Sequence, residues 1–223
     1  MFLNHLYREK QSEHIYFKGG TCLMFFYSSA RFSEDLDFST TLSKSAVDKL
    51  LRKALIGVQK EVTDTALVLI WQGRKGLRYR LQYRGGEFKY PLGIRIDFSH
   101  EAALLPPDVS GIKSIFPITA FSLIVHLKKE EILAEKIRAF LTRAKGRDIF
   151  DLVHLLDNKT VLEEKILQKK LKAVNLTFDK ERFLEKIKKY EEKKLAMDIS
   201  QFLPGHLRKM VPILKEKLLM GFG

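Results

Sequence analysis

The run Asp35-Leu36-Asp37-Phe38-Ser39 constrains the fold of this chain more than any other part of the sequence. Polar and apolar residues alternate in it with the period of two that is typical of a half-buried β-strand. In such a strand both carboxylates point to one face, and the two apolar side chains point to the other. Two like charges side by side are unfavourable unless a positive group lies close to both. The run therefore predicts a strand whose polar face attracts a cation.

A glycine turn precedes this strand. We expect a strand over residues 14–17, a turn at Lys18-Gly19-Gly20-Thr21, and a short apolar helix that ends before Arg31. Backbone N–H groups at the start of a helix can bind a phosphate. A pair of glycines alone is more often only a turn. This pair is evidence for phosphate binding because of its position, one short helix upstream of Asp35. Ser33 could add a hydroxyl contact to a phosphate or cap the entry of the strand.

The remaining pattern predicts an α+β protein. Strands are expected over residues 66–71, 77–84 and 93–99, and helices over residues 2–14 and 44–60. In residues 77–84 apolar side chains alternate with three arginines and a glutamine, so one side of the sheet is predicted to be basic. From residue 128 to the end the pattern is helical. We expect a mixed β-sheet with flanking helices over residues 1–127 and a helical C-terminal portion over residues 128–223.

The charge balance indicates a polyanionic partner. The chain has 40 Lys and Arg against 27 Asp and Glu, a formal net charge of +13. Nucleic acid is the first candidate for such a partner and an anionic membrane the second, and the alternative is that the charge only keeps the protein in solution. The single cysteine, Cys22, excludes a disulfide within the chain and a thiolate metal site. No apolar stretch reaches the ~18 residues of a membrane span and the start is too charged for a secretion signal, so we expect a cytoplasmic protein.

A third carboxylate lies in a matching setting. Asp97 belongs to "RIDFS", which repeats the character of "DLDFS" at Asp35 and Asp37. One buried aspartate on a strand is more often a hydrogen-bonded structural group than a ligand. Three in similar settings favour a divalent cation, because Mg²⁺ prefers carboxylate oxygens.

The helical portion begins with a second charged pattern. Lys136, Arg143 and Arg147 are spaced at i, i+7 and i+11, which predicts one basic face on a helix that could bind a triphosphate. The alternative is a solvated basic stripe. Asp148 follows Gly146-Arg147, so it could be a helix N-cap, a catalytic group, or both.

These motifs together resemble the nucleotidyltransferase superfamily that includes DNA polymerase beta, and within it the AbiEii/AbiGii-type toxin family. The first motif, "KGGT...R-x-S-x-D-x-D", is met by Lys18 to Thr21, Arg31, Ser33, Asp35 and Asp37. The later signature, "K-x-x-A-x-x-x-R-x-x-x-R-D-x-x-D-L", is met by Lys136, Ala139, Arg143, Arg147, Asp148, Asp151 and Leu152. The spacer between Gly20 and Asp35 is longer than in many members of the superfamily, as the narrower family allows.

The resemblance implies nucleotidyl transfer, in which an acceptor hydroxyl attacks the α-phosphorus of an NTP held with Mg²⁺ and pyrophosphate leaves. It implies that Asp35 and Asp37 hold the metal and that a third carboxylate helps to activate the acceptor hydroxyl. Asp97 is assigned that role, and a place among the metal carboxylates, by position only. It also implies that Lys136 contacts the phosphates and that Asp148 orients Lys136 or the acceptor. The implied nucleotide-binding residues are Lys18, Gly19, Gly20, Thr21, Arg31, Ser33, Arg143 and Arg147.

We interpret the sequence as the toxin of a toxin–antitoxin pair, which the resemblance implies would add nucleotides to tRNA acceptor ends and have a cognate antitoxin. A tRNA or other RNA acceptor fits the net charge of +13. Two alternatives stay open: transfer of a nucleoside monophosphate to a protein hydroxyl, and a nucleic-acid or antitoxin-binding module without turnover. The sequence does not specify the nucleotide.

Overall fold

The computed structural model describes residues 1–86, 90–112 and 122–222, which form two compact units. The first unit comprises Met1–Ser28 and Ser33–Leu127, and the second comprises Ser29–Phe32 and Lys128–Gly223. Each unit is described by itself below. The short segment 29–32 makes its contacts with the helices of the second unit although it precedes the strand of Asp37 in the chain.

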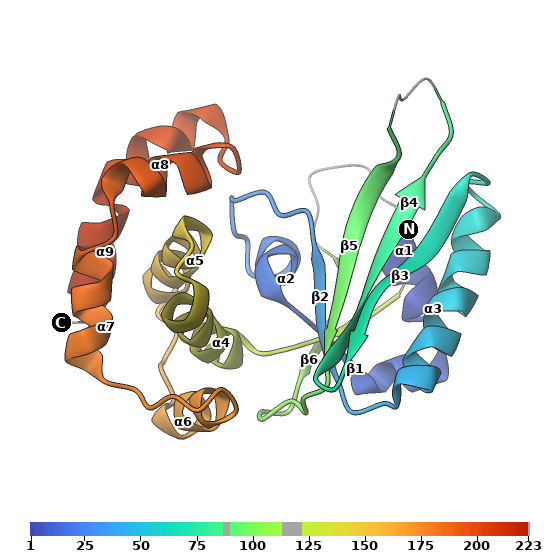
Figure 1. Ribbon diagram of the computed structural model, residues 1–223, viewed down its shortest axis with the longest axis horizontal. Helices are drawn as coiled ribbons and strands as arrows, with labels where there is room; N and C mark the ends of the chain where they lie inside the picture. Colours follow the sequence, from blue (N-terminus) through green and yellow to red (C-terminus); the bar gives the residue numbers. More distant parts are fainter. Residues whose placement is uncertain (87–89, 113–121, 223) are drawn as a thin grey trace. The chain divides into compact units, whose positions relative to one another are not determined.

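The first unit is built on a mixed β-sheet (Figure 1). Among the described residues the sheet has the strand order β3-β4-β5-β2-β1-β7-β6. The strands are β1 (Ile15–Lys18), β2 (Leu36–Thr40), β3 (Thr65–Gly73), β4 (Gly76–Tyr83), β5 (Leu92–Ser99), β6 (Asp108–Ser110) and β7 (Ile124–His126). β2 pairs with β5, and β1 with β7, in parallel, and the other neighbours are antiparallel. The predicted α+β class is confirmed.

Helices of the first unit are α1 (Phe2–Leu6), α2 (Gly19–Phe26) and α3 (Lys44–Gln59), with a 3₁₀ helix at Lys10–His14. The sequence predicted one helix over residues 2–14, but the structure divides this stretch in two. α3 starts where the Ser43 hydroxyl accepts a hydrogen bond from the Ala46 N–H, as an N-cap residue does. It covers one face of the sheet, where Tyr79 on β4 donates a hydrogen bond to Asp48 of α3.

A row of phenylalanines sets the register of the central strands. Phe17 on β1 pairs with Phe38 on β2, and Phe38 pairs with Phe98 on β5. The ring centroids are 5.1 Å apart for the first pair and 4.8 Å apart for the second, and all three side chains are buried. A slip of one residue would expose this row, so its burial also determines which residues share the opposite face.

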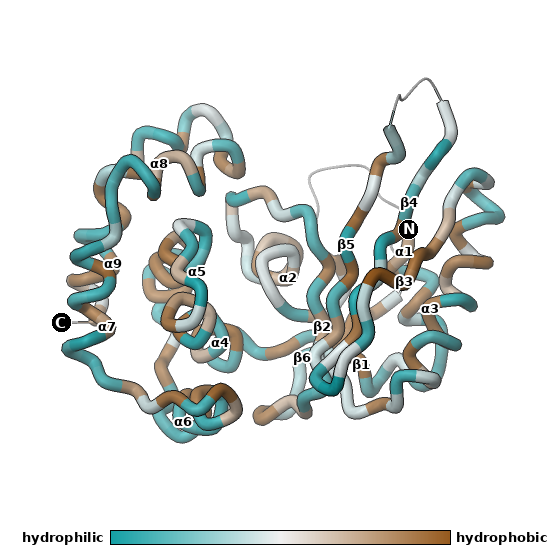
Figure 2. The backbone as a smooth tube through the Cα atoms, in the orientation of Figure 1, coloured by the Kyte–Doolittle hydropathy of each residue, from teal (hydrophilic) through white to brown (hydrophobic). Residues whose placement is uncertain are grey.

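The second unit is helical: α4 (Lys129–Arg143), α5 (Gly146–Asp157), α6 (Glu164–Lys172), α7 (Lys180–Lys188), α8 (Glu192–Ser200), a 3₁₀ helix at Gly205–Ile213, and α9 (Leu214–Phe222). α5 packs against α4, α8 and α9. Hydrophilic and hydrophobic residues alternate along these helices (Figure 2), as expected for helices that each bury one side.

Candidate active site

A polar row crosses the sheet of the first unit, one residue along from the phenylalanine row. Lys18 on β1 pairs with Asp37 on β2, Asp37 pairs with Asp97 on β5, and Asp97 pairs with Arg78 on β4. Paired residues of neighbouring strands project from the same face of a sheet. The register therefore brings Asp37 and Asp97, which are 60 residues apart in the sequence, side by side, and Asp35 precedes β2 by one residue.

Two arginines neutralise the carboxylates of this row. Nε of Arg78 is 2.6 Å from Oδ1 of Asp97, and Nε of Arg95 is 3.1 Å from Oδ2 of the same carboxylate. Arg95 also pairs through Nη2 with Asp35. The hydrogen bond to Asp97 raises the pKa of Arg78. The sheet face predicted to be basic is confirmed, because Arg78 and Arg80 are exposed while Leu77, Tyr79 and Leu81 are buried.

Gly19 makes room for the carboxylate of Asp37. Its φ angle is +79°, and a Cβ atom at this position would lie 2.3 Å from Oδ2 of Asp37. Both facts require glycine here, because a side chain would be strained and would collide with the carboxylate. Thr21, two residues on, donates a hydrogen bond of 2.5 Å from its hydroxyl to the Asp35 carbonyl oxygen. The start of α2 and the approach to β2 are thus joined at the glycine turn.

The other predicted nucleotide-binding residues of the first motif have different surroundings. Lys18 and Gly20 are buried beside this turn, and Ser33 is half-buried in the segment that leads to β2. Arg31 belongs to the second unit. The structure thus brings Lys18, Gly19, Asp35, Asp37 and Asp97 together in the first unit by register and contact.

The carboxylates of Asp35, Asp37 and Asp97 suit Mg²⁺ in chemistry, because all three supply oxygen donors. Among residues 1–86, 90–112 and 122–222, no group of three or more His, Cys, Asp or Glu side chains is arranged to hold a metal ion. Asp35 and Asp97 instead contact the guanidinium of Arg95, so a positive group already lies beside two of the three carboxylates. Hard oxygen donors on adjacent strands are what Mg²⁺ prefers, so the residues fit the ion once the guanidinium is displaced.

The second unit contains a buried ion network around Asp151. Arg31 donates to both carboxylate oxygens of Asp151 at 2.9 Å, and Nζ of Lys136 lies 2.7 Å from Oδ2. The exposed fractions of the side chains are 3% for Arg31, 0% for Asp151 and 9% for Lys136. Burial alone would raise the pKa of Asp151, but the charges of Arg31 and Lys136 outweigh burial and hold the pKa well below its usual range.

Asp148 has a different partner from the one the sequence indicated. Its carboxylate accepts hydrogen bonds from Nε and Nη2 of Arg143 at 3.1 and 2.9 Å, while Lys136 Nζ is 4.0 Å away. The N-cap residue of α5 is Lys145, so the interpretation of Asp148 as the helix cap was wrong. Asp148 lies in the first turn of α5, where a carboxylate is favoured by the helix dipole.

The prediction that Lys136, Arg143 and Arg147 share one helix face was wrong for Arg147, while Lys136 and Arg143 do lie on the same helix, α4. α4 ends at Arg143, where Ala144 takes a left-handed conformation with φ of 46°, and α5 begins at Gly146. Arg147 therefore belongs to the next helix, where its guanidinium lies 5.1 Å from the centroid of the Phe202 ring. The i, i+7, i+11 spacing places residues on one face only within a single uninterrupted helix, and here the helix ends before Arg147.

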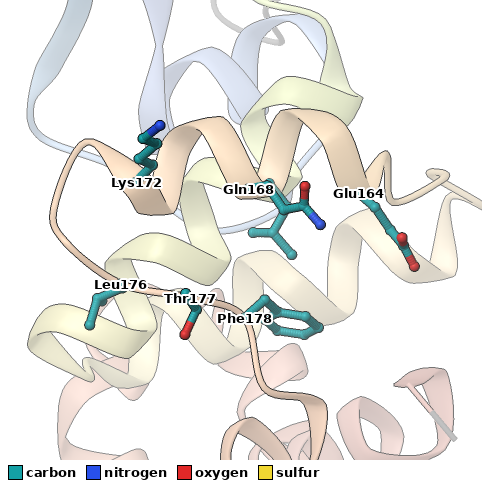
Figure 3. A pocket seen from close by; sticks show the side chains of 7 residues that line it. Glu164, Gln168, Lys172, Leu176, Thr177 and Phe178 are labelled. Atoms are coloured by element: carbon teal, nitrogen blue, oxygen red, sulfur yellow. The ribbon is translucent and has the colours of Figure 1, made fainter.

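A cavity of about 560 Å³ lies in the second unit near α6 (Figure 3). Leu167, Leu176 and Phe178 supply apolar lining, and its polar side chains are those of Glu164, Gln168, Lys172 and Thr177. None of the residues predicted from the sequence lines it. We assign no role to this cavity, because its lining contains no cluster of titratable groups that would perform chemistry.

The sequence profile of the family described as nucleotidyl transferase AbiEii toxin, type IV toxin–antitoxin system, matches residues 2–212. This chain belongs to that family. The predicted recognition is therefore confirmed, and the family assignment makes the protein a nucleotidyltransferase. No curated protein matches the chain in sequence.

Solved structures show the same fold. MenT4, a nucleotidyltransferase toxin from Mycobacterium tuberculosis, is 17% identical with a TM-score of 0.65, and the match covers 100% of this chain and 79% of that one. JHP933 from Helicobacter pylori is 19% identical with a TM-score of 0.56, and the match covers 99% and 91%. In the described part of this AbiEii family member, no helix is both long and apolar enough to cross a membrane.

Two residues, one in each unit, had no role assigned from the sequence. Asp151 is the centre of the buried network, yet the sequence showed it only as a letter of the second motif. Arg95 binds two of the three carboxylates. Arg95 lies two residues before Asp97 on the same strand, so the two side chains project from the same face. This spacing was the sequence signal that could have identified Arg95 as a partner of the carboxylates.

Proposed function

We propose that the protein is a Mg²⁺-dependent toxin that transfers a nucleoside monophosphate from an NTP to the acceptor end of tRNA. The observation that supports this most strongly is the register pairing of Asp37 with Asp97, with Asp35 beside them. In a family of nucleotidyl transferases, three carboxylates on one sheet face are suited to a metal-dependent phosphoryl-group chemistry. The net charge of +13 favours a polyanionic acceptor.

In this mechanism Asp35, Asp37 and Asp97 would hold the metal. When bound, Mg²⁺ would neutralise phosphate charge and polarise the α-phosphorus for attack by the acceptor hydroxyl. The N–H groups that follow Gly19 at the start of α2 would receive phosphate oxygens, which the positive end of a helix favours. As the acceptor oxygen bonds to the α-phosphorus, the bond to pyrophosphate breaks, and Asp97 would take up the proton of the acceptor hydroxyl.

The second unit, considered by itself, contains cationic groups that are candidates for phosphate contacts. We assign Lys136 to a phosphate, because it is an ammonium group held in one position by Asp151. Arg31 then acts indirectly, by fixing the carboxylate that holds Lys136. Arg143 and Arg147 remain candidates for phosphate contacts, and Asp148 would orient Arg143. We propose a cytoplasmic location, where tRNA and NTP would both be available. The type IV toxin–antitoxin family implies an antitoxin partner.

Labelling identifies the acceptor. The protein is incubated with Mg²⁺, total cellular RNA and protein, and each labelled NTP in turn, with Asp37→Asn as the inactive control. We expect label at the 3′ end of RNA of tRNA size, removed by ribonuclease. Label on protein would replace the proposal with protein nucleotidylation, and RNA binding without label from any NTP would indicate a binding module without turnover.

A further inference from the structure

Trp71 extends the polar row at the edge of the sheet. It lies on β3, an edge strand, and pairs in register with Arg78, the partner of Asp97. The row thus runs from Trp71 through Arg78 and Asp97 to Asp37. Trp71 is the only tryptophan of the chain, and 51% of its surface is exposed. A half-exposed aromatic ring on a face that carries candidate catalytic groups is available to stack on a ligand.

A β-bulge places Trp71 on this face. The register of β3 and β4 pairs Leu69 with Tyr79 and then shifts, so that Trp71 and not Ile70 pairs with Arg78. Without the shift, Trp71 would pair with Leu77 and project from the buried face. Bulges of this kind redirect a side chain. Gly73 makes room for the ring, because a Cβ atom there would lie 2.1 Å from an atom of the indole.

Several basic residues lie near Trp71 in the sequence and in the strand register. The turn between β3 and β4 carries Arg74 and Lys75, both exposed. Arg80 on β4 is exposed and stands directly opposite Arg95 on β5. Arg95 already contacts the carboxylates of Asp35 and Asp97, so Arg80 is the guanidinium of this opposed pair that we consider for a phosphate. An aromatic ring among guanidinium groups is the arrangement that binds single-stranded nucleic acid, with bases stacked on the ring and phosphates on the cations.

We propose that Trp71, Arg78 and Arg80 bind the single-stranded 3′ end of the RNA acceptor, with a base stacked on the indole of Trp71. The proposal rests on the proposed function and specifies how the acceptor is held. Trp71 is three strands from Asp37, roughly 14 Å at the usual spacing of strands. A few nucleotides of RNA span this distance. The base stacked on Trp71 would therefore belong to a nucleotide that lies shortly before the 3′ end with the reacting hydroxyl. Stacking tolerates any base, so the surface contributes affinity rather than sequence choice.

Intrinsic fluorescence tests the proposal directly, because emission from tryptophan comes from this residue alone. The whole protein is titrated, without NTP, with a short single-stranded oligoribonucleotide and separately with its duplex. We expect the single strand to quench the emission strongly and the duplex weakly. No quenching at concentrations where the labelled oligonucleotide is bound would overturn the proposal.

Variants separate stacking from other causes. By anisotropy of a labelled oligoribonucleotide, Trp71→Ala should weaken binding about tenfold, and Trp71→Phe should retain most of the affinity. Arg80→Ala should reduce the slope of log affinity against log salt by about 0.7. The matched control is Ile70→Ala, the exposed neighbour that the bulge leaves unpaired, which should not change the affinity. Equal losses for Trp71→Ala and Ile70→Ala would overturn the proposal, because they would indicate that the edge strand as a whole is responsible.

Kinetics distinguish this proposal from the proposed function. Trp71→Ala should raise KM for the RNA about tenfold and leave KM for the NTP unchanged. If RNA is labelled normally by Trp71→Ala, only the present proposal fails. If the label goes to protein while RNA still quenches Trp71, the surface binds RNA and the proposed function fails.

Discussion

Arg31 and Asp151 lie 120 residues apart in the chain and form a buried bidentate ion pair, with both N–O distances 2.9 Å. The pair joins a residue of the first sequence motif to a residue of the second, and both residues lie in the second unit. Lys136 shares the same carboxylate. A candidate phosphate ligand is therefore fixed by a residue more than a hundred positions away from it in the sequence, Arg31.

Replacing Asp151 by Asn should reduce the free energy of unfolding by about 3 kcal/mol. Removing one partner from a buried ion pair leaves the other charges, here those of Arg31 and Lys136, without compensation. Urea unfolding measures the loss. The control is Glu185→Gln, which removes an exposed pair with Lys189 and should stay within about 0.5 kcal/mol of the wild type.

The same substitution has a characteristic pH dependence. The folded-state pKa of Asp151 is depressed below the unfolded value of about 3.9, so as the pH falls the unfolded chain takes up the proton first. The stability that the carboxylate contributes is present in full above about pH 5 and is lost as the pH falls through this range toward the folded-state pKa. The difference in unfolding free energy between wild type and Asp151→Asn should therefore narrow below about pH 4. A difference that stays constant would contradict the assigned ion pair.

Gly19→Ala should remove transfer activity and destabilise the protein by about 1 to 3 kcal/mol. The added methyl group meets Oδ2 of Asp37, and the positive φ is strained for any other residue. Thermal unfolding and the labelling assay measure the two effects. Gly111→Ala is the control, since a Cβ atom at Gly111 meets nothing within 4 Å, and it should be near neutral in both measurements.

Lys136→Ala should reduce the transfer rate about a hundredfold and leave Mg²⁺ binding intact. The loss corresponds to roughly 3 kcal/mol for a charge-assisted contact that strengthens as charge moves to the leaving pyrophosphate. Lys136→Arg should recover little, because the planar guanidinium is larger than the ammonium it replaces. Lys128→Ala, at the residue that precedes α4, is the control. Equal losses at both lysines would show that general positive charge, and not a placed phosphate ligand, is responsible.

Arg95→Ala should strengthen Mg²⁺ binding about tenfold in the absence of NTP. The guanidinium contacts Asp35 and Asp97 and must move before a metal ion can bind the same oxygens. Removing it also removes a like charge from beside the cation, worth about 1 kcal/mol at a partly exposed site. Calorimetric titration with MgCl₂ measures the change. Weaker binding would mean that Arg95 organises the carboxylates instead of competing for them.

Local patterns in the sequence were sufficient to predict most of the first unit. The alternation around Asp35 and Asp37 predicted the strand, and β2 begins one residue later, at Leu36. The alternation in residues 77–84 predicted a basic face. Such patterns succeed because burial of one face depends only on the order of neighbouring residues.

The sequence by itself determined which charged residues are present and which faces of the strands carry them. Only the tertiary structure decided which of these charged side chains contact one another. Strand register placed Asp97 beside Asp37. The packing of distant segments brought Asp151 into ion pairs with Arg31 and Lys136. A single bulge moved Trp71 to the polar face, and the left-handed Ala144 separated Arg147 from the helix of Lys136. These outcomes depend on contacts between distant segments and on single backbone angles, and neither leaves a periodic signal in the sequence.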